Sequence, residues 1–486
     1  MSNSSFRNKQ TFENIKKDLF LELLNKYESI EKDLHLDKSL VFNIPWWDNL
    51  RYPLFQEILH ELRLLERPYS KQLRSHPPNY FKKIVRLVLS SLSVFASCSP
   101  LMMRRNSILI WGHPRRKYEN GFHVDIYTDP LLRMFPKNFH CSVLARGVKS
   151  KYQPPSSVHS FYCADCLIAI GQVFAFISSV LRRDKCNNSV VDKLEKRIAQ
   201  DFGLTFNVQK RVFRSALNWY GQQIIMYLFL LLKKPSHIFL VVSAGNEPLI
   251  AAAKATKIPV LELQHGSPAR GKLNYDYSSG ITKTNFSDYF LSFGEYWRRS
   301  LSLPLPSRKI INFGFPYLYQ KLNDYSEVTK ENCLLVISQS VHASSLAQFA
   351  IEVASFNTDI EVIYKAHPAE FNGVEPEYFS SLRECGIEIA SQDVDLYFLF
   401  AKARWQVGVY STALYEGLCF DTVLSLLALP GYECMMPLVF SGSARVLKTS
   451  RDFDLNWLPK KTNLKQIFCS PSTDFLQEIL DLTQLP

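Results

Sequence analysis

Two short motifs in the C-terminal half of the chain carry side chains that can bind a phosphate. Lys365, His367 and Pro368 close the apolar run 360–363, and Ser411 and Thr412 follow a strand-like run at the start of a predicted helix. Ligands of an open parallel sheet lie beyond the carboxyl ends of its strands, and a hydroxyl-capped helix start offers N–H groups to an anion. Together the motifs predict a clamp for a nucleotide phosphate. Either motif alone is as readily a loop or an ordinary helix cap.

Polar residues also follow two predicted strands in the N-terminal half. Glu247 follows the strand 238–242, and Gln264, His265 and Gly266 follow the strand 260–263, with an Ala-rich helix between them. A single βαβ unit brings both strand ends to the same edge of the sheet. Glu247 and His265 are therefore candidates for a general base or a transition-state stabiliser, and Gly266 permits close backbone approach. The alternative is a turn with a surface histidine.

Two carboxylates follow the first predicted strand, residues 107–111. Glu119 and Asp125 lie in a segment rich in ionisable residues, and either is a candidate catalytic carboxylate for a second substrate. The alternative for this segment is a solvated loop with salt bridges.

The order of elements predicts the fold class. From residue 107 strands alternate with helices, which favours an α/β fold with two Rossmann-like domains facing a cleft. We expect a helical extension over 1–105, an N-terminal domain over 106–310 and a Pro-rich crossing over 311–330. A C-terminal domain over 331–450 and a tail over 451–486 that packs back on the first domain complete the chain. The residues 158–232 are expected to be a helical block, and no GxGxxG motif indicates a dinucleotide-binding dehydrogenase.

Composition restricts the partners. The 486 residues carry a net charge of +12 and a pI near 9.1, which favours anionic partners. No zinc-finger spacing or RNP-like pattern is present, so nucleic acid is not expected. The first residues contain no apolar signal core, and the ten cysteines are scattered, which fits a reducing cytoplasm. Cys163 and Cys166 form a CxxC without a second pair, a weak signal for metal or redox function.

Short apolar runs flanked by basic residues suggest contact with a membrane surface. They are roughly 10–16 residues long, below the ~20 residues needed to span a bilayer. Buried helices are one interpretation, and helices on the inner face of an anionic membrane are the other. The runs are 87–96 after Lys82 and Lys83, 167–181 before Arg182 and Arg183, and 224–232 before Lys233 and Lys234.

The motifs resemble those of GT-B-fold glycosyltransferases of bacterial surface-polysaccharide assembly. The group that they resemble holds polysialyltransferases, capsule Kdo transferases and CDP-glycerol glycerophosphotransferases. Its HP motif and downstream Ser/Thr pair grip the phosphate of a CMP- or CDP-linked donor. The resemblance implies this role for Lys365, His367, Ser411 and Thr412, and places Glu416 at the donor ribose.

The resemblance extends over residues 235–430. Gln264-His265-Gly266 is similar to a QHG sequence of several capsule-type enzymes, whereas the acidic acceptor-base motif of polysialyltransferases is not found. Nucleotide binding of this kind needs no metal and no cofactor. Asp393-Val394-Asp395 has the letters of a metal-binding DxD motif, but we interpret it as a helix cap.

The sequence thus predicts a cytoplasmic glycosyltransferase, peripheral to the membrane. It would move a sugar, such as Kdo or another CMP-linked sugar, onto a lipid-linked capsule or lipopolysaccharide chain. Two alternatives remain open: a CDP-alditol polyol-phosphate transferase, and a non-catalytic protein that binds a nucleotide sugar.

Overall fold

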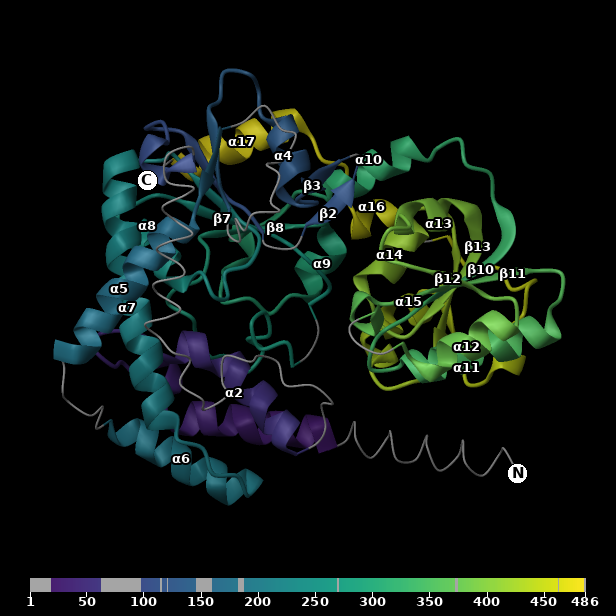
Figure 1. Ribbon diagram of the computed structural model, residues 1–486, viewed down its shortest axis with the longest axis horizontal. Helices are drawn as coiled ribbons and strands as arrows, with labels where there is room; N and C mark the ends of the chain where they lie inside the picture. Colours follow the sequence, from purple (N-terminus) through teal and green to yellow (C-terminus); the bar gives the residue numbers. More distant parts are fainter. Residues whose placement is uncertain are drawn as a thin grey trace. The chain divides into compact units, whose positions relative to one another are not determined.

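The computed structural model describes residues 19–62, 98–113, 116–119, 121–145, 160–181, 188–268, 271–371, 375–461 and 463–484. The chain divides into two compact units (Figure 1). An N-terminal unit comprises Leu21–Pro316 with Ser470–Pro486, and a C-terminal unit comprises Tyr317–Cys469. Each unit contains its own parallel sheet.

The sheet of the N-terminal unit has seven parallel strands in the order β5-β4-β1-β6-β7-β8-β9. The order of the first six is that of a Rossmann fold, and the strand order reverses between β1 and β6. The strands are β1 (Ile108–Trp111), β4 (Cys141–Ala145), β5 (Ser160–Cys163), β6 (Ile238–Leu240), β7 (Val260–Leu263), β8 (Tyr289–Ser292) and β9 (Ile310–Asn312).

Helices cover both faces of this sheet, as a buried parallel sheet requires. Leu109 and Trp111 of β1 pack with α5 (Asp165–Leu181), α7 (Val208–Lys233) and α8 (Glu247–Ala255). Ile108 and Ile110 pack on the other face with α4 (Thr128–Met134) and α17 (Thr473–Gln484). Successive side chains of β1 thus point to opposite faces of the sheet and contribute to two hydrophobic cores. The C-terminal helix α17 belongs to the N-terminal unit.

Other described elements of this unit lie outside the sheet. A helical segment, residues 19–33, is followed by η1 (Leu36–Lys38) and α2 (Trp47–Glu61). A hairpin of β2 (Lys117–Glu119) and β3 (Phe122–Val124) follows β1. The remaining elements are η2 (Pro100–Met102), α6 (Ser189–Phe202), α9 (Glu295–Ser300) and η3 (Ser307–Lys309).

The sheet of the C-terminal unit has six parallel strands in the order β12-β11-β10-β13-β14-β15. This is again the Rossmann order, with its reversal between β10 and β13. The strands are β10 (Glu331–Ile337), β11 (Glu361–Lys365), β12 (Glu388–Ala390), β13 (Ala403–Gly408), β14 (Val423–Leu427) and β15 (Ala444–Leu447).

The helices of the C-terminal unit are short, and most of them connect neighbouring strands. They are α10 (Pro316–Asp324), α11 (Ala343–Phe356), α12 (Glu377–Glu384), α13 (Leu396–Lys402), α14 (Thr412–Leu418), α15 (Met436–Phe440) and α16 (Leu464–Ile467). Short 3-10 turns are η4 (Pro368–Phe371), η5 (Tyr432–Met435) and η6 (Ser450–Asp452).

The α/β class and the two Rossmann-like sheets confirm the prediction from sequence, and β7 has the predicted bounds. One local prediction was wrong, because the block 158–232 contains the strand β5. The segment after β1 contains a hairpin, and Glu247 begins the helix that follows β6. The predictions on residues 82–97 and on Arg182 and Arg183 lie outside the described residues. In the described part of the chain, no helix is long and apolar enough to cross a membrane.

Candidate functional site

His367 lies on an exposed turn just beyond the carboxyl end of β11. Its Nδ1 accepts a hydrogen bond from the backbone N–H of Ala369 at 3.1 Å. A neutral imidazole with an accepting Nδ1 carries its proton on Nε2, so this assignment makes Nε2 a donor. Pro368 begins the 3-10 turn that carries Ala369. The local hydrogen bond thus presets His367 to donate to an anion.

A buried carboxylate, Glu370, holds this turn in place. It accepts hydrogen bonds from the backbone N–H of His367 at 2.6 Å, from Ser338 Oγ at 2.6 Å, and from the hydroxyls of Tyr364 and Tyr378 at 3.0 and 2.8 Å. Burial and the charge of Glu370 raise the pKa of Tyr364, which therefore stays a donor. Sequence reasoning missed Glu370; its signal is a carboxylate three residues after the histidine.

Lys365 makes contacts that differ from the predicted phosphate contact. Its Nζ donates to the carbonyl oxygens of Ser391 and of Val394, the latter at 2.8 Å. These bonds tie β11 to the loop before α13. Asp395 caps that helix by accepting from Tyr397 N at 3.0 Å, which confirms the interpretation of the Asp393–Asp395 sequence as a cap.

Ser411 is the N-cap of α14, as its ordinary interpretation predicted. Its Oγ accepts from Ala413 N at 3.2 Å, and Thr412 begins the seven-residue helix. Glu416, one turn further along, accepts from the hydroxyl of the buried Tyr397 at 2.6 Å. The hydroxyl of Ser411 is thus used locally, and Glu416 is held by a neighbour.

The point where the strand order of the C-terminal sheet reverses lies between the loops after β10 and β13. The backbone N–H of Tyr410 donates to Gln339 Oε1 at 2.9 Å, which joins the two loops. His342, almost fully buried, contacts Pro430 O through Nε2 at 2.9 Å and packs edge-on against Tyr410. Gly431 has φ +101°, and a Cβ there would lie 2.3 Å from the Tyr410 ring. Sequence analysis did not identify Gln339 or His342, because the Ser-Gln-Ser-Val-His segment matches no motif.

In the N-terminal unit, the corresponding reversal point carries His113, which follows β1. Asp125, only 1% exposed, accepts from His113 N at 2.7 Å through Oδ2. Its Oδ1 accepts from Tyr127 N at 3.0 Å and Thr128 N at 3.2 Å. Both oxygens of Asp125 therefore bind backbone N–H groups. Glu119 lies elsewhere, at the end of β2 opposite Phe122 in the hairpin.

His265 lies beside His113. The ring centroids of the two histidines are 6.4 Å apart, and His265 also packs against Tyr275 at 5.4 Å. The Tyr127 hydroxyl donates to His265 O at 2.8 Å. The structure therefore brings together two predicted residues, His265 and Asp125, through His113 and Tyr127, which were not predicted as site residues.

Gln264 braces the Gln-His-Gly turn from a buried position. Its Nε2 donates to Gly266 O at 3.0 Å, and its Oε1 accepts from Phe293 N at 2.9 Å. Both ends of the amide are thereby engaged within the turn and with the residue after β8. Gln264 is therefore placed to position His265.

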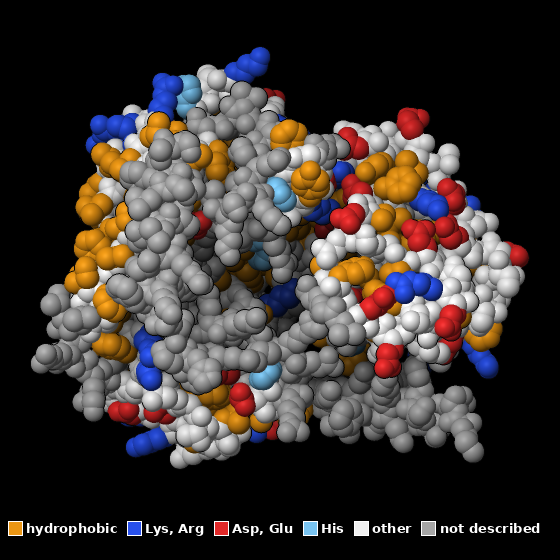
Figure 2. All heavy atoms as spheres, viewed as in Figure 1, with side chains coloured by type: hydrophobic (Ala, Val, Ile, Leu, Met, Phe, Trp, Pro, Cys, Tyr) orange, Lys and Arg blue, Asp and Glu red, His pale blue; other side chains and the backbone are white. Residues whose placement is uncertain are grey.

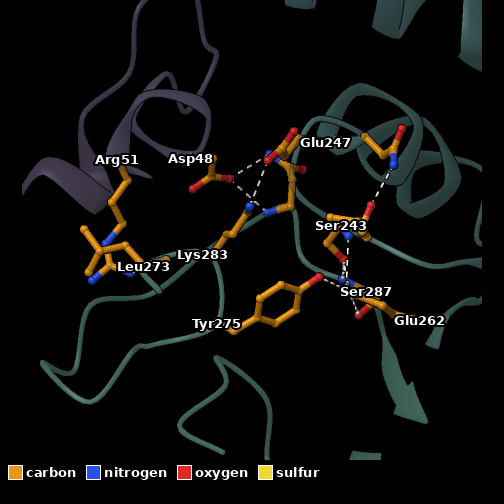
Figure 3. A network of polar contacts seen from close by, with 12 residues as sticks. Asp48, Arg51, Ser243, Glu247, Glu262, Leu273, Tyr275, Lys283 and Ser287 are labelled. Atoms are coloured by element: carbon orange, nitrogen blue, oxygen red, sulfur yellow. Dashed lines mark hydrogen bonds and ion pairs between the residues drawn. The ribbon is translucent and has the colours of Figure 1, made fainter. Parts of the chain in front are cut away.

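Glu262, fully buried within β7, is surrounded by hydrogen-bond donors (Figure 3). It accepts from Ser243 N and Ser287 Oγ, each at 3.1 Å, and from the Tyr275 hydroxyl. Burial raises the pKa of Glu262, while these hydrogen bonds lower it in part. Tyr275, against which His265 packs, is therefore anchored by this carboxylate. Sequence analysis missed Glu262, because a glutamate in an apolar strand has no motif.

Glu247 is bound in a separate buried network. Its Oε1 lies 2.8 Å from Lys283 Nζ, and both side chains are at most 2% exposed (Figure 3). Burial lowers the pKa of Lys283, but the charges of Glu247, Tyr277 and Asp48 and the hydrogen bond to Glu247 together raise it above its ordinary value, so that the ammonium form persists. Asp48 of α2 lies close to this pair, and its burial raises its pKa to about 6. Glu247 is thus part of an ion pair beside the N-terminal helices.

Comparisons with known proteins give a likeness of fold. No family model matches the chain, and no curated protein matches its sequence.

Among the described residues, no group of three or more His, Cys, Asp or Glu side chains is arranged to hold a metal ion.

Three solved structures represent the likeness. UDP-GlcNAc 2-epimerase from Methanocaldococcus jannaschii is 13% identical over 78% of this chain and 100% of that chain, with a TM-score of 0.45. MurG from Acinetobacter baumannii is 11% identical over 78% and 99%, with a TM-score of 0.41. The wall teichoic acid polymerase TagF is 11% identical over 84% and 98%, with a TM-score of 0.42. Sequence identities and TM-scores this low say nothing of this chain's substrate or reaction, which have to be inferred from its own residues.

Proposed function

We propose that this protein is a glycosyltransferase that transfers a sugar from a cytidylate-linked nucleotide donor to a lipid-linked surface glycan. The C-terminal unit binds the donor, and the N-terminal unit binds the acceptor. Each unit offers polar side chains at the reversal point of a Rossmann-type sheet, where such sheets bind ligands.

One observation carries the donor assignment: the exposed His367 turn and the start of α14 leave the same edge of one sheet. Lys365 pairs with Ile337, and Val407 pairs with Val336, so β11 and β13 end at the same level. With β10 between them, they are about 10 Å apart. His367 is exposed beyond this edge, and because its Nδ1 accepts from Ala369 N, its Nε2 carries the proton that can be donated to an anion.

The proposed mechanism uses His367 to stabilise the departing phosphate. A charge-assisted hydrogen bond to a leaving group is strongest when negative charge develops on it, and is worth on the order of 3 kcal/mol. Glu370 keeps the turn rigid, so that little reorganisation is needed. The hydroxyl and first N–H groups around Ser411 and Thr412 would complete the phosphate site, with Lys365 and Glu416 positioning the loops around it.

We further propose that the N-terminal unit binds a membrane surface. Apolar side chains of α5 and α7 are exposed, and Figure 2 shows hydrophobic side chains gathered along the left edge, over these helices. The exposed side chains are Ile170, Phe174, Phe176, Ile177, Tyr227, Leu228, Leu231 and Leu232. Exposed Lys234 follows α7, and Asn106 N donates to Lys233 O at 3.0 Å, which brings the segment of exposed Arg104 and Arg105 to the end of that helix. These cations would suit anionic headgroups.

The experiment that tests the donor proposal is a panel of nucleotide donors. CMP-Kdo, CMP-sialic acid, CDP-glycerol and several UDP-sugars are added separately, and the melting temperature is measured. A ligand at 100 times its Kd stabilises by about 2.7 kcal/mol, and a shift of roughly 5–10 °C is expected. Stabilisation by the CMP-sugars supports the proposal. Stabilisation by CDP-glycerol alone would favour polyol-phosphate transfer. An unchanged melting temperature with every donor would refute the proposal that this protein binds a nucleotide donor.

A further inference from the structure

We infer that His113 and His265 form a catalytic histidine pair, with His113 as the general base that takes the proton of the acceptor hydroxyl. This inference rests on the proposed glycosyl transfer and names the residues that carry out its acceptor half. The sequence leaves the base open among Glu247, His265, Asp125 and Glu119, and His113 is not among these candidates.

The position of His113 is the first support. His113 follows β1 at the reversal point of the N-terminal sheet, where a ligand is expected. The buried carboxylate of Asp125 fixes its backbone N–H at 2.7 Å, and its ring packs edge-on against Tyr127 with centroids 5.7 Å apart. Arg116 Nε donates to His113 O at 3.4 Å. The backbone and one side of the ring are therefore held.

The placement of His265 is the second support. Its ring lies 6.4 Å from that of His113 and rests on Tyr275, which Glu262 anchors. Both histidines are partly exposed, unlike the carboxylates around them. A single oxygen lying between the two rings would be within hydrogen-bonding reach of both, which is the geometry that acid–base catalysis requires.

The carboxylates at this edge are less suited to the role. Asp125 uses both oxygens for backbone N–H groups, Glu262 is fully buried under hydrogen bonds, and Glu247 is paired with Lys283. A base must lose and gain a proton at the reacting hydroxyl, and these three groups are bound elsewhere. Imidazole also suits proton transfer near neutral pH.

The acceptor hydroxyl oxygen forms a bond to the anomeric carbon of the donor sugar, and its proton passes to a ring nitrogen of His113. The bond from the anomeric carbon to the phosphate oxygen breaks, and the nucleotide leaves with the bonding electron pair. His265 donates a hydrogen bond to the acceptor oxygen and orients it. A single displacement of this kind inverts the anomeric centre.

The test compares His113→Gln and His265→Gln with His140→Ala, a control at an exposed histidine of the same unit. The full-length proteins are assayed for nucleotide release from each donor of the panel, with bacterial membranes as the acceptor source. We expect kcat to fall by about 10²–10⁴-fold in His113→Gln. His265→Gln should lose less, and His140→Ala should match the wild type.

Two further readouts distinguish a base from a structural residue. Nucleotide-induced stabilisation should persist in both glutamine variants, because donor binding belongs to the other unit. The acid limb of the pH–rate profile should disappear from the residual activity of His113→Gln. In the wild type, the titratable and charged groups that face His113 are Asp125, Arg116, Tyr127 and His265.

The outcomes are separable. If His113→Gln keeps wild-type kcat, or loses activity only in proportion to a lowered melting temperature, the inference is overturned while the donor proposal stands. If the wild type releases no nucleotide from any donor, the proposed function and the inference fail together. Should His113→Gln not fold, His113→Asn is assayed by the same criteria.

Discussion

Arg51 and Glu31 form a buried ion pair that ties the N-terminal helices to the loop between β7 and β8. Arg51 Nε lies 2.6 Å from Glu31 Oε1, and Arg51 Nη1 donates to Leu273 O at 2.6 Å and to Asp276 O at 2.8 Å. That loop also carries His265 and Tyr275. The helical residues near the N-terminus therefore contribute to the structure that supports the candidate site.

Removing Arg51 should destabilise the N-terminal unit. Arg51→Met leaves the carboxylate of Glu31 buried without its cation, which typically costs about 3–5 kcal/mol. The double variant Arg51→Met/Glu31→Leu should recover part of this loss. Urea unfolding measures the effect, with Arg197→Met as the control, because its pairs with Asp33 and Asp201 are exposed and worth at most about 1 kcal/mol. Equal losses in Arg51→Met and Arg197→Met would contradict the buried role.

Much of the fold could be predicted from the sequence because fully buried strands produce continuous apolar runs. β7 and β8 are of this kind, and the turns after them contain recognisable polar residues. β5 could not be predicted, because Ser160–Cys163 continues into the apolar helix α5 and periodicity alone does not separate them.

The candidate site was harder to predict than the fold. His265 and His367 stand at strand ends, where sequence position indicates function. The roles of Glu262 and Glu370 depend on contacts with distant parts of the chain, such as Ser243, Ser287 and Ser338. No local pattern encodes such contacts, so these two buried carboxylates became visible only in three dimensions.

Loss of the His367 imidazole should abolish most turnover. His367→Ala removes the preset donor and should reduce kcat about 10²-fold, on the order of 3 kcal/mol, because one contact to the leaving group is lost. The residue is exposed, so the melting temperature without ligand should hardly change. Gln392→Ala is the control, since Gln392 is exposed and contacts Pro368 O in the same turn. Near-normal turnover in His367→Ala would exclude a phosphate clamp.

Replacement of Glu247 should affect stability more than the sequence suggested. The sequence predicts that Glu247→Gln lowers turnover at an unchanged melting temperature. The buried pair with Lys283 leads us to expect instead a loss of about 3–5 kcal/mol, because the ammonium group would lose its partner. Glu295→Gln, which breaks exposed pairs with Arg298 and Arg299, should cost about 1 kcal/mol or less. A Glu247→Gln protein that melts normally but lacks turnover would restore the catalytic role.

Asp129 should make the protein less stable as the pH rises. Burial, and to a smaller extent the charge of Asp125, raises the pKa of Asp129 to about 6 in the folded state from the ordinary 3.8. Between these two values the folded state binds more protons than the unfolded state, so the free energy of unfolding falls as pH rises from about 4 to about 6. Asp129→Asn should remove this part of the slope. Urea titrations at pH 4 and pH 7 measure it, and the exposed Asp324→Asn should retain the wild-type slope.

The mode of membrane binding can be separated into apolar and electrostatic parts. Phe174 on α5 and Leu228 on α7 are 43% and 54% exposed, and the two helices pack closely, since a Cβ on Gly221 would lie 2.2 Å from Gly171 O. Burying such a side chain in lipid is worth about 1.5–3 kcal/mol. Phe174→Ser and Leu228→Ser should therefore each weaken binding to neutral and anionic vesicles by about tenfold or more. Phe356→Ser, at an exposed position in the C-terminal unit, is the control.

The cations near this face should act on anionic vesicles alone. The sequence predicts release by high salt, with Lys233 as one of the contacts, but Lys233 is buried and donates to Leu101 O. Arg104, Arg105 and Lys234 are exposed, and each contributes about 1 kcal/mol near an anionic surface. A variant with glutamine at Arg104, Arg105 and Lys234 should lose this binding free energy in co-sedimentation with anionic vesicles. It should bind neutral vesicles like the wild type. Binding that vanishes completely in high salt, and that Phe174→Ser leaves unchanged, would show that the apolar face takes no part.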